Sequence, residues 1–123
     1  MINKDTDYGS KRHIVGAHYG FRDWLAQRVT AVLQIAYTLI IIILIVFFRN
    51  DGYEGWSDLF SHNLMKLASL LITVSICYHA WVGIRDLWMD YIKPVGIRLS
   101  LQILTIVWLL GCGIWMFEIL WKN

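Results

Sequence analysis

The sequence predicts an all-α membrane protein with three transmembrane helices, and its composition and hydropathy pattern lead to this fold class. The chain has 123 residues and is 58% hydrophobic, above the roughly 45–50% apolar content of soluble domains. Three apolar stretches reach the length of about 20 residues that a helix needs to cross the hydrocarbon core. Seven tryptophans fit this class because indole rings favour the headgroup region. A net charge of only +2, with no basic patch among aromatic residues, argues against nucleic acid as a partner.

Residues 1–22 are predicted to form an N-terminal tail, and residues 23–123 a single membrane-anchor domain. The tail mixes charged residues with glycine and histidine, which is typical of segments that are flexible or that a partner orders. The first span is expected from about residue 26 to 48, with the run LIIIILIVFF at its centre.

The first half of this span carries a polar face. Four residues repeat there at helical spacing: Gln27, Ala31, Gln34 and Thr38. One interpretation is a seam of hydrogen bonds to a neighbouring helix. The neighbouring Arg28 either meets an anionic group near the membrane surface or extends its guanidinium to the headgroups.

The remaining elements follow in order. Residues 49–63 are rich in Asp, Gly and aromatic residues, and Trp56 and Phe60 predict a short helix lying in the membrane interface. The second span is expected at about 64–88 and the third at about 97–121. Pro94 separates them, because proline has no N–H and disfavours helix in the preceding residue. Gly111 and Gly113 are expected to permit close helix packing.

The orientation follows from the distribution of Lys and Arg. Five lie in the segment up to Arg28 and three between Arg85 and Arg98, whereas only Arg49, Lys66 and Lys122 fall on the opposite side. Because basic residues are retained in the cytoplasm, the N-terminus and the turn at Pro94 are predicted to be cytoplasmic. The C-terminus is then periplasmic.

One helix face in the second span combines polar and small residues at spacings of three and four: Ser75, His79, Gly83, Asp86 and Asp90. An ionisable group is costly to bury unpaired within a membrane span, so a residue of this kind is a candidate for a functional role. His79 has three interpretations: a bond to a neighbouring helix, part of a proton path, or an axial ligand to haem with Gly83 leaving room for the macrocycle. The other histidines lie outside the spans, so a second haem ligand would come from a partner chain. Arg28 and Arg22 are the candidates to meet the haem propionates.

Asp90 and Tyr91 lie at the cytoplasmic end of the second span. A phenol hydroxyl can donate a hydrogen bond to a quinone carbonyl, and a neighbouring carboxylate can assist proton transfer. Tyr91 is equally well explained as an aromatic residue of the membrane interface. Asp90 could instead pair with Lys93 or Arg98, and spacing alone leaves these alternatives open.

The segment HAWVGIRDLWMDYIKP, residues 79–94, resembles the signature of the hydrophobic membrane anchor subunit of bacterial succinate dehydrogenase, the D subunit of respiratory complex II. RDWLAQRVTAV is similar to the entry into the first span of that family. The resemblance covers roughly residues 21–121. It implies that His79 is one axial ligand of a haem b whose other ligand is a histidine of the C subunit, and that Tyr91 and Asp90 belong to a ubiquinone site. It also implies that Arg28 lies near the propionates. Arg22 stands where some members have a histidine.

The resemblance further implies a multi-pass protein of the bacterial inner membrane, a non-catalytic anchor in an oxidoreductase complex. Its expected partners are a cytochrome b556-type C subunit, an iron–sulfur subunit, a flavoprotein subunit, the lipid bilayer and quinone. Whether three heterotetramers associate into a trimer stays open. The alternatives are the anchor of a fumarate reductase, which runs the reverse reaction, and a structural membrane subunit without a cofactor.

Overall fold

The computed structural model describes residues 17–47 and 52–122, which form four helices. They are α1 (Ala17–Phe47), α2 (Gly52–Ser61), α3 (Asn63–Tyr91) and α4 (Val95–Trp121). The predicted tail up to residue 16, the end of the first predicted span at 48, and residues 49–51 lie outside the described residues. Among the described helices, α1, α3 and α4 are long and apolar enough to cross a membrane. The predicted all-α, three-span class is confirmed, and the chain is a multi-pass membrane protein.

The boundaries differ from the prediction at the first span. Helix α1 begins at Ala17, whereas the tail was expected to reach residue 22 and the span to start near 26. The lead-in FRDWLAQR contains no proline and only residues that a helix accepts, so it continues directly into the apolar run. The 31 residues of α1 extend about 46 Å at 1.5 Å per residue. The helix therefore projects beyond a hydrocarbon core of about 30 Å.

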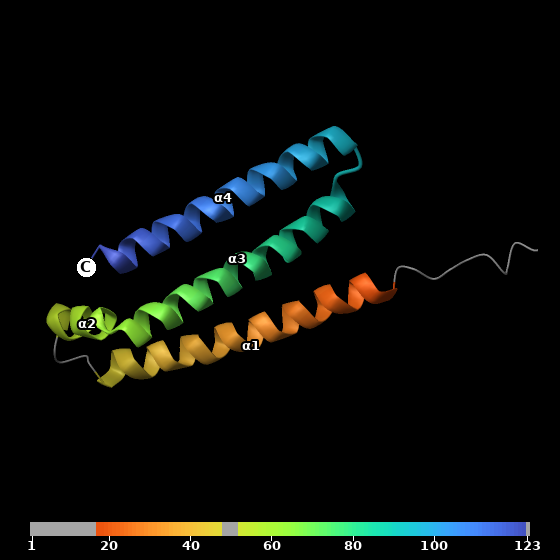
Figure 1. Ribbon diagram of the computed structural model, residues 1–123. Helices are drawn as coiled ribbons and strands as arrows, with labels where there is room; N and C mark the ends of the chain where they lie inside the picture. Colours follow the sequence, from red (N-terminus) through yellow and green to blue (C-terminus); the bar gives the residue numbers. More distant parts are fainter. Residues whose placement is uncertain (1–16, 48–51, 123) are drawn as a thin grey trace, which may run out of the picture.

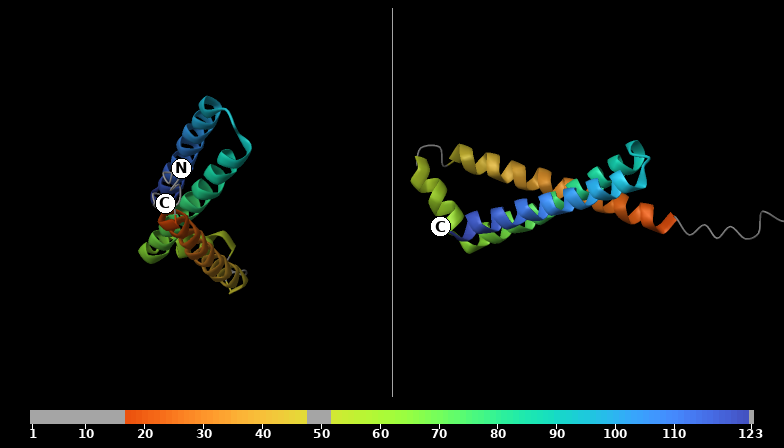
Figure 2. Two further views of the ribbon diagram at one scale, coloured as in Figure 1. Left: turned by 90° about the vertical axis from the view of Figure 1, so that its right-hand side faces the viewer. Right: turned by 90° about the horizontal axis from the view of Figure 1, so that it is seen from above.

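Helix α3 lies between α1 and α4 and packs against both (Figure 1). Helices α1 and α4 run in one direction and α3 in the other, so the start of α1 and the α3–α4 turn lie at one end of the molecule, and α2 lies at the other (Figure 1). Figure 2 shows that α1 crosses the α3–α4 pair at an angle, with α2 turned away from the long helices. Helix α2 confirms that residues 52–61 form a short helix, in which the rings of Trp56 and Phe60 pack with centroids 4.9 Å apart; its place in the membrane interface stays a prediction.

The turn at Pro94 is short and well defined. Ile92 caps α3 by donating its N–H to Trp88 O over 3.1 Å, and Pro94 is the N-cap of α4 with φ −67° and ψ 119°. The missing N–H of proline costs nothing at this position, because the first N–H groups of a helix have no partner within the helix. The predicted break between the second and third spans is confirmed.

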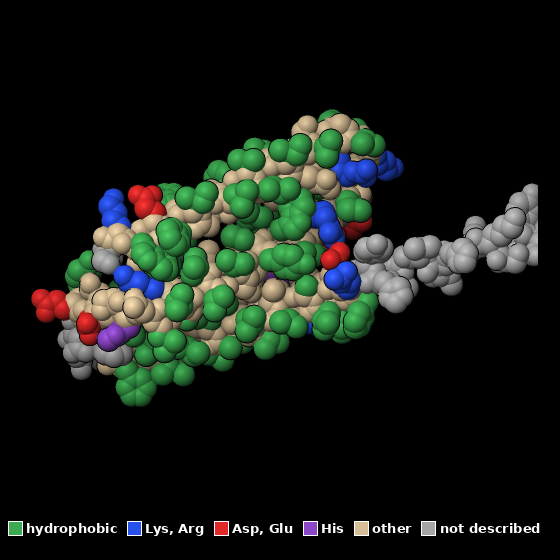
Figure 3. All heavy atoms as spheres, viewed as in Figure 1, with side chains coloured by type: hydrophobic (Ala, Val, Ile, Leu, Met, Phe, Trp, Pro, Cys, Tyr) green, Lys and Arg blue, Asp and Glu red, His purple; other side chains and the backbone are tan. Residues whose placement is uncertain are grey.

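The packing core is small and lies along α3. Its buried residues are Ser69, Ile72, Ser75 and Val82, at spacings of three, three and seven. Small residues at such positions let neighbouring helices approach closely in a membrane. Most other large apolar side chains are exposed, and Figure 3 shows them covering the middle of one face, with charged side chains gathered towards the two ends. Lipid and partner subunits would cover this surface.

The two glycines of the third span do not behave as expected. A Cβ added at Gly111 or Gly113 would have no heavy atom within 4 Å. The prediction that these glycines permit close packing is therefore wrong within this chain. Helix α4 packs against α3, and Gly113 lines a groove between the two helices, where no neighbouring atom lies close to the position that a Cβ would take.

Candidate functional site

His79 lies in the interface between α1 and α3, where two residues of α1 contact it. Thr30 Oγ1 is 2.9 Å from His79 Nδ1, and Gln27 Nε2 donates to His79 O over 2.9 Å. The second bond confirms the predicted seam at Gln27, whereas the amide nitrogen of Gln34 on the same face has no partner among the described residues. Ring and backbone of His79 are thus both held by one segment of α1.

Two grooves adjoin at His79. Their volumes are about 690 Å³ and about 300 Å³, and both include Ala31 and His79 in their walls. The larger reaches towards the start of α1 past Trp24 and Arg28 and along α3 past Val82. The smaller continues along α1 past Gln34 to Leu39. Because the α1 residues recur at three- and four-residue spacing, the two grooves follow one side of that helix.

Charges in the larger groove are partly neutralised within it. Arg85 Nη2 lies 2.6 Å from Asp23 Oδ2 and 2.9 Å from Asp86 Oδ1, so two carboxylates hold this guanidinium. The guanidinium of Arg28 lies over the ring of Trp24, 5.6 Å from its centroid, and no carboxylate contacts it among the described residues. Arg28 is therefore available for an anionic ligand group.

Two buried polar atoms in the described part of the chain have no hydrogen-bond partner: Gln34 Nε2 and Ser75 Oγ. Ser75 is 9% exposed and lies one helical turn before His79. An unpaired buried polar atom costs about 1–3 kcal/mol, so these two atoms mark places where the packing of the described residues leaves hydrogen-bonding capacity unused.

Gly83 lies beside the hydrogen bond that holds His79 rather than in a groove wall. A Cβ at Gly83 would lie 3.9 Å from Gln27 Nε2, an ordinary van der Waals distance. The glycine borders the amide of Gln27, and that amide donates to His79 O.

The other predicted site residues lie on the outside of this chain. Arg22 is exposed near the start of α1, and Asp90 and Tyr91 are exposed at the end of α3, where Tyr91 is 78% exposed. Asp90 makes no ion pair with Lys93 or Arg98, two residues that the structure describes. Arg22 and the α3 terminus lie at the same end of the molecule (Figure 1).

Three contacts of the site were not anticipated from the sequence: Thr30 with His79, Asp23 with Arg85, and Arg28 with Trp24. The last could have been found, since residues four apart on a helix are neighbours. The first two join residues 49 and 62 positions apart, and no local spacing reveals such pairs.

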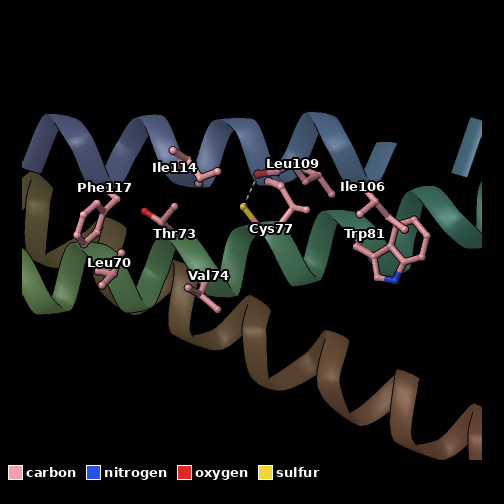
Figure 4. Close-up of a pocket in the computed structure, with 11 residues that line it drawn as sticks. Leu70, Thr73, Val74, Cys77, Trp81, Ile106, Leu109, Ile114 and Phe117 are labelled. Atoms are coloured by element: carbon pink, nitrogen blue, oxygen red, sulfur yellow. Dashed lines mark hydrogen bonds between the residues drawn. The ribbon is translucent and has the colours of Figure 1, made fainter. Parts of the chain in front are cut away.

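A separate groove of about 590 Å³ runs between α3 and α4. Figure 4 shows its side chains, among them Trp81, Ile106 and Phe117. Cys77 donates its thiol to Leu109 O over 3.6 Å. The walls are almost wholly apolar and present no ionisable ligand group besides this thiol, so this groove lacks the chemistry of the His79 region.

Comparison with known proteins identifies the family. The family model described as succinate dehydrogenase/fumarate reductase transmembrane subunit matches residues 2–113, and so extends into the N-terminal segment that the motifs left outside the resemblance. The succinate dehydrogenase hydrophobic membrane anchor subunit of Coxiella burnetii is 39% identical over 102 residues, which cover 83% of this chain and 89% of that protein. With the three membrane-spanning helices, these matches show that the chain belongs to the succinate dehydrogenase/fumarate reductase transmembrane subunit family.

Proposed function

We propose that this chain is the anchor subunit of a succinate:quinone oxidoreductase that binds haem b together with a C subunit and contributes to a ubiquinone-reduction site. The observation that carries the proposal is the environment of His79. One ring nitrogen contacts Thr30, and among the described residues the other has no partner and is not buried. Two grooves adjoin His79, and they leave space for a group from outside this chain next to this residue.

The residues around His79 fit a haem group. His79 Nε2 would be the iron ligand, and the uncompensated guanidinium of Arg28 would meet a propionate, with Arg22 on the same end of the helix. The unpaired atoms of Gln34 and Ser75 are consistent with a further group that completes this region. Bound haem supplies one-electron transfer. The second axial ligand would come from the C subunit, because His79 is the only histidine within the described spans.

Tyr91 and Asp90 are proposed to form this chain's share of the quinone site. Both side chains are exposed at the end of α3, so neither is committed to the packing of this chain. The phenol hydroxyl of Tyr91 would donate to a quinone carbonyl, and Asp90 would orient that hydroxyl or pass protons. Partner subunits would enclose the quinone.

The proposed complex includes an iron–sulfur subunit and a flavoprotein subunit, which carry out succinate oxidation at the cytoplasmic face of the bacterial inner membrane. The N-terminus and the turn at Pro94 would face them. Residues 1–22 would act as the cytoplasmic tail and 23–123 as the anchor domain. The family model covers succinate dehydrogenases and fumarate reductases alike, so the alternative is an anchor for the reverse reaction.

A substitution at His79 tests this function. In the assembled complex, His79→Leu is expected to remove or strongly alter the b-type redox difference spectrum. His62→Leu is the control, because His62 is exposed and its side chain makes no capping hydrogen bond. An unchanged spectrum in the His79→Leu complex would favour the structural subunit without a cofactor. Immunodetection of all subunits distinguishes loss of haem from loss of assembly.

A further inference from the structure

Thr30 makes a contact that decides which nitrogen of His79 is available as a ligand. Its Oγ1 lies 2.7 Å from Ala26 O, 3.2 Å from Gln27 O and 2.9 Å from His79 Nδ1. Three polar atoms thus surround a hydroxyl that carries one proton and can accept two hydrogen bonds. The position of that proton fixes the role of the histidine.

The carbonyl of Ala26 takes the proton. A carbonyl oxygen can only accept, and the 2.7 Å separation is the usual length of an O–H···O hydrogen bond. Thr30 Oγ1 is then an acceptor towards His79, so Nδ1 carries the imidazole proton and donates it. A neutral imidazole has one donor and one acceptor nitrogen. Nε2 therefore holds the free lone pair.

A second hydrogen bond from α1 limits how the imidazole ring of His79 can be placed. Gln27 holds the backbone of His79 through its carbonyl, three residues before the threonine that holds the ring. Within the described residues Nε2 has no partner, yet it is not one of the buried unpaired atoms. His79 lines both grooves, which gives an unpartnered Nε2 space for a ligand on that side of the residue.

We infer that Thr30 is a positioning residue for His79: it accepts a hydrogen bond from Nδ1–H, and so keeps Nε2 deprotonated and directed towards the groove as the iron ligand. This inference rests on the proposed haem function. A hydrogen bond from Nδ1 makes the opposite nitrogen a stronger electron donor, which favours the ferric state. Thr30 thereby lowers the midpoint potential of the haem.

The test uses the assembled complex with Thr30→Val, which keeps the shape and removes the acceptor. We expect a shift of the haem midpoint potential to more positive values and a roughly 10-fold loss of haem affinity, at the lower end of what loss of such a partner costs. Thr30→Ser keeps the hydroxyl, so its haem midpoint potential and haem affinity should stay close to those of the wild type. Thr73→Val is the control, because Thr73 makes the same bond to the carbonyl four residues before it, Ser69 O over 2.7 Å, and has no hydrogen bond to a histidine.

A wild-type midpoint potential in Thr30→Val, or an equal shift in Thr73→Val, overturns the inference. If Thr30→Val does not assemble, Thr30→Cys replaces it, since a thiol is a weaker acceptor. An intermediate shift then supports the inference, and an unchanged potential overturns it. An unchanged spectrum in His79→Leu would defeat the haem assignment itself, so the two failures are distinguishable.

Discussion

At the scale of single residues, the described site residues divide by exposure. His79 is partly enclosed and hydrogen-bonded by α1 at its ring and its backbone, whereas the side chains of Asp90 and Tyr91 are exposed and make no hydrogen bond within the described residues. The first arrangement fixes the position of His79 within this chain. The second needs partner subunits to complete it, so substitutions at the two places should have different consequences.

Tyr91→Phe is expected to lower quinone reduction about 3- to 10-fold, since a neutral hydrogen bond contributes about 0.5–1.5 kcal/mol. Succinate oxidation with an artificial dye should not change, because the dye does not use the quinone site. Tyr53→Phe is a matched control: Tyr53 is 79% exposed and Tyr91 78%, and Tyr53 lies on α2 at the opposite end. Equal loss of both activities in Tyr91→Phe would point to failed assembly and contradict the quinone role.

At the scale of helices, hydrogen bonds between side chains hold α3 to its neighbours. Tyr37 OH lies 2.6 Å from Ser69 Oγ in the α1–α3 contact, and Ser69 donates its own proton to Met65 O over 2.8 Å. Tyr37 is therefore the donor. On the other side of α3, Trp88 Nε1 donates to Thr105 Oγ1 over 3.1 Å. This hydrogen bond joins α3 to α4.

Tyr37→Phe should destabilise the α1–α3 contact only slightly, by about 0.6 kcal/mol, the average for a hydrogen bond between membrane helices. Ser69→Ile should cost more, about 1–3 kcal/mol, because Ser69 is fully buried and the larger side chain overpacks the interface. Thermal unfolding of the purified complex measures both. If Ser69→Ile proved as stable as Tyr37→Phe, the close approach of the two helices would be refuted.

At the scale of the whole molecule, the helices define two ends. One end holds the start of α1 and the α3–α4 turn, and the other holds α2 (Figure 1). The basic residues Arg22, Lys93 and Arg98 belong to the segments of the first end. Between the ends, large apolar side chains of the described helices are exposed over long surfaces. A bilayer and neighbouring subunits are the environments in which such surfaces are stable.

The orientation can be measured with a membrane-impermeant maleimide on intact spheroplasts. In a background with Cys77 and Cys112 replaced by serine, Lys122→Cys should be labelled and Lys93→Cys should be labelled only after the membrane is opened. The physical reason is retention of basic segments in the cytoplasm. Labelling of Lys93→Cys in intact spheroplasts would reverse the proposed orientation.

Much of the fold was predictable because its signals are local. Apolar run length gave three spans, and Pro94 marked the turn between the last two. The start of α1 at Ala17 was missed because the polar lead-in gives no hydropathy signal, although it continues the same helix. The polar face of the first span was identified as a seam, and the Gln27 bond agrees. Thr30 was overlooked because it lies beside that face.

The sequence by itself determined the spans, their order and the placement of His79, Asp90 and Tyr91 along one helix, since these depend on length and helical period. Only the tertiary structure decided that Thr30 contacts the ring of His79 and that Asp23 pairs with Arg85. Periodicity states which residues share a face of one helix. The rotation and sliding of one helix against another depend on side-chain packing across the interface, here around Ser69 and Val82 of α3.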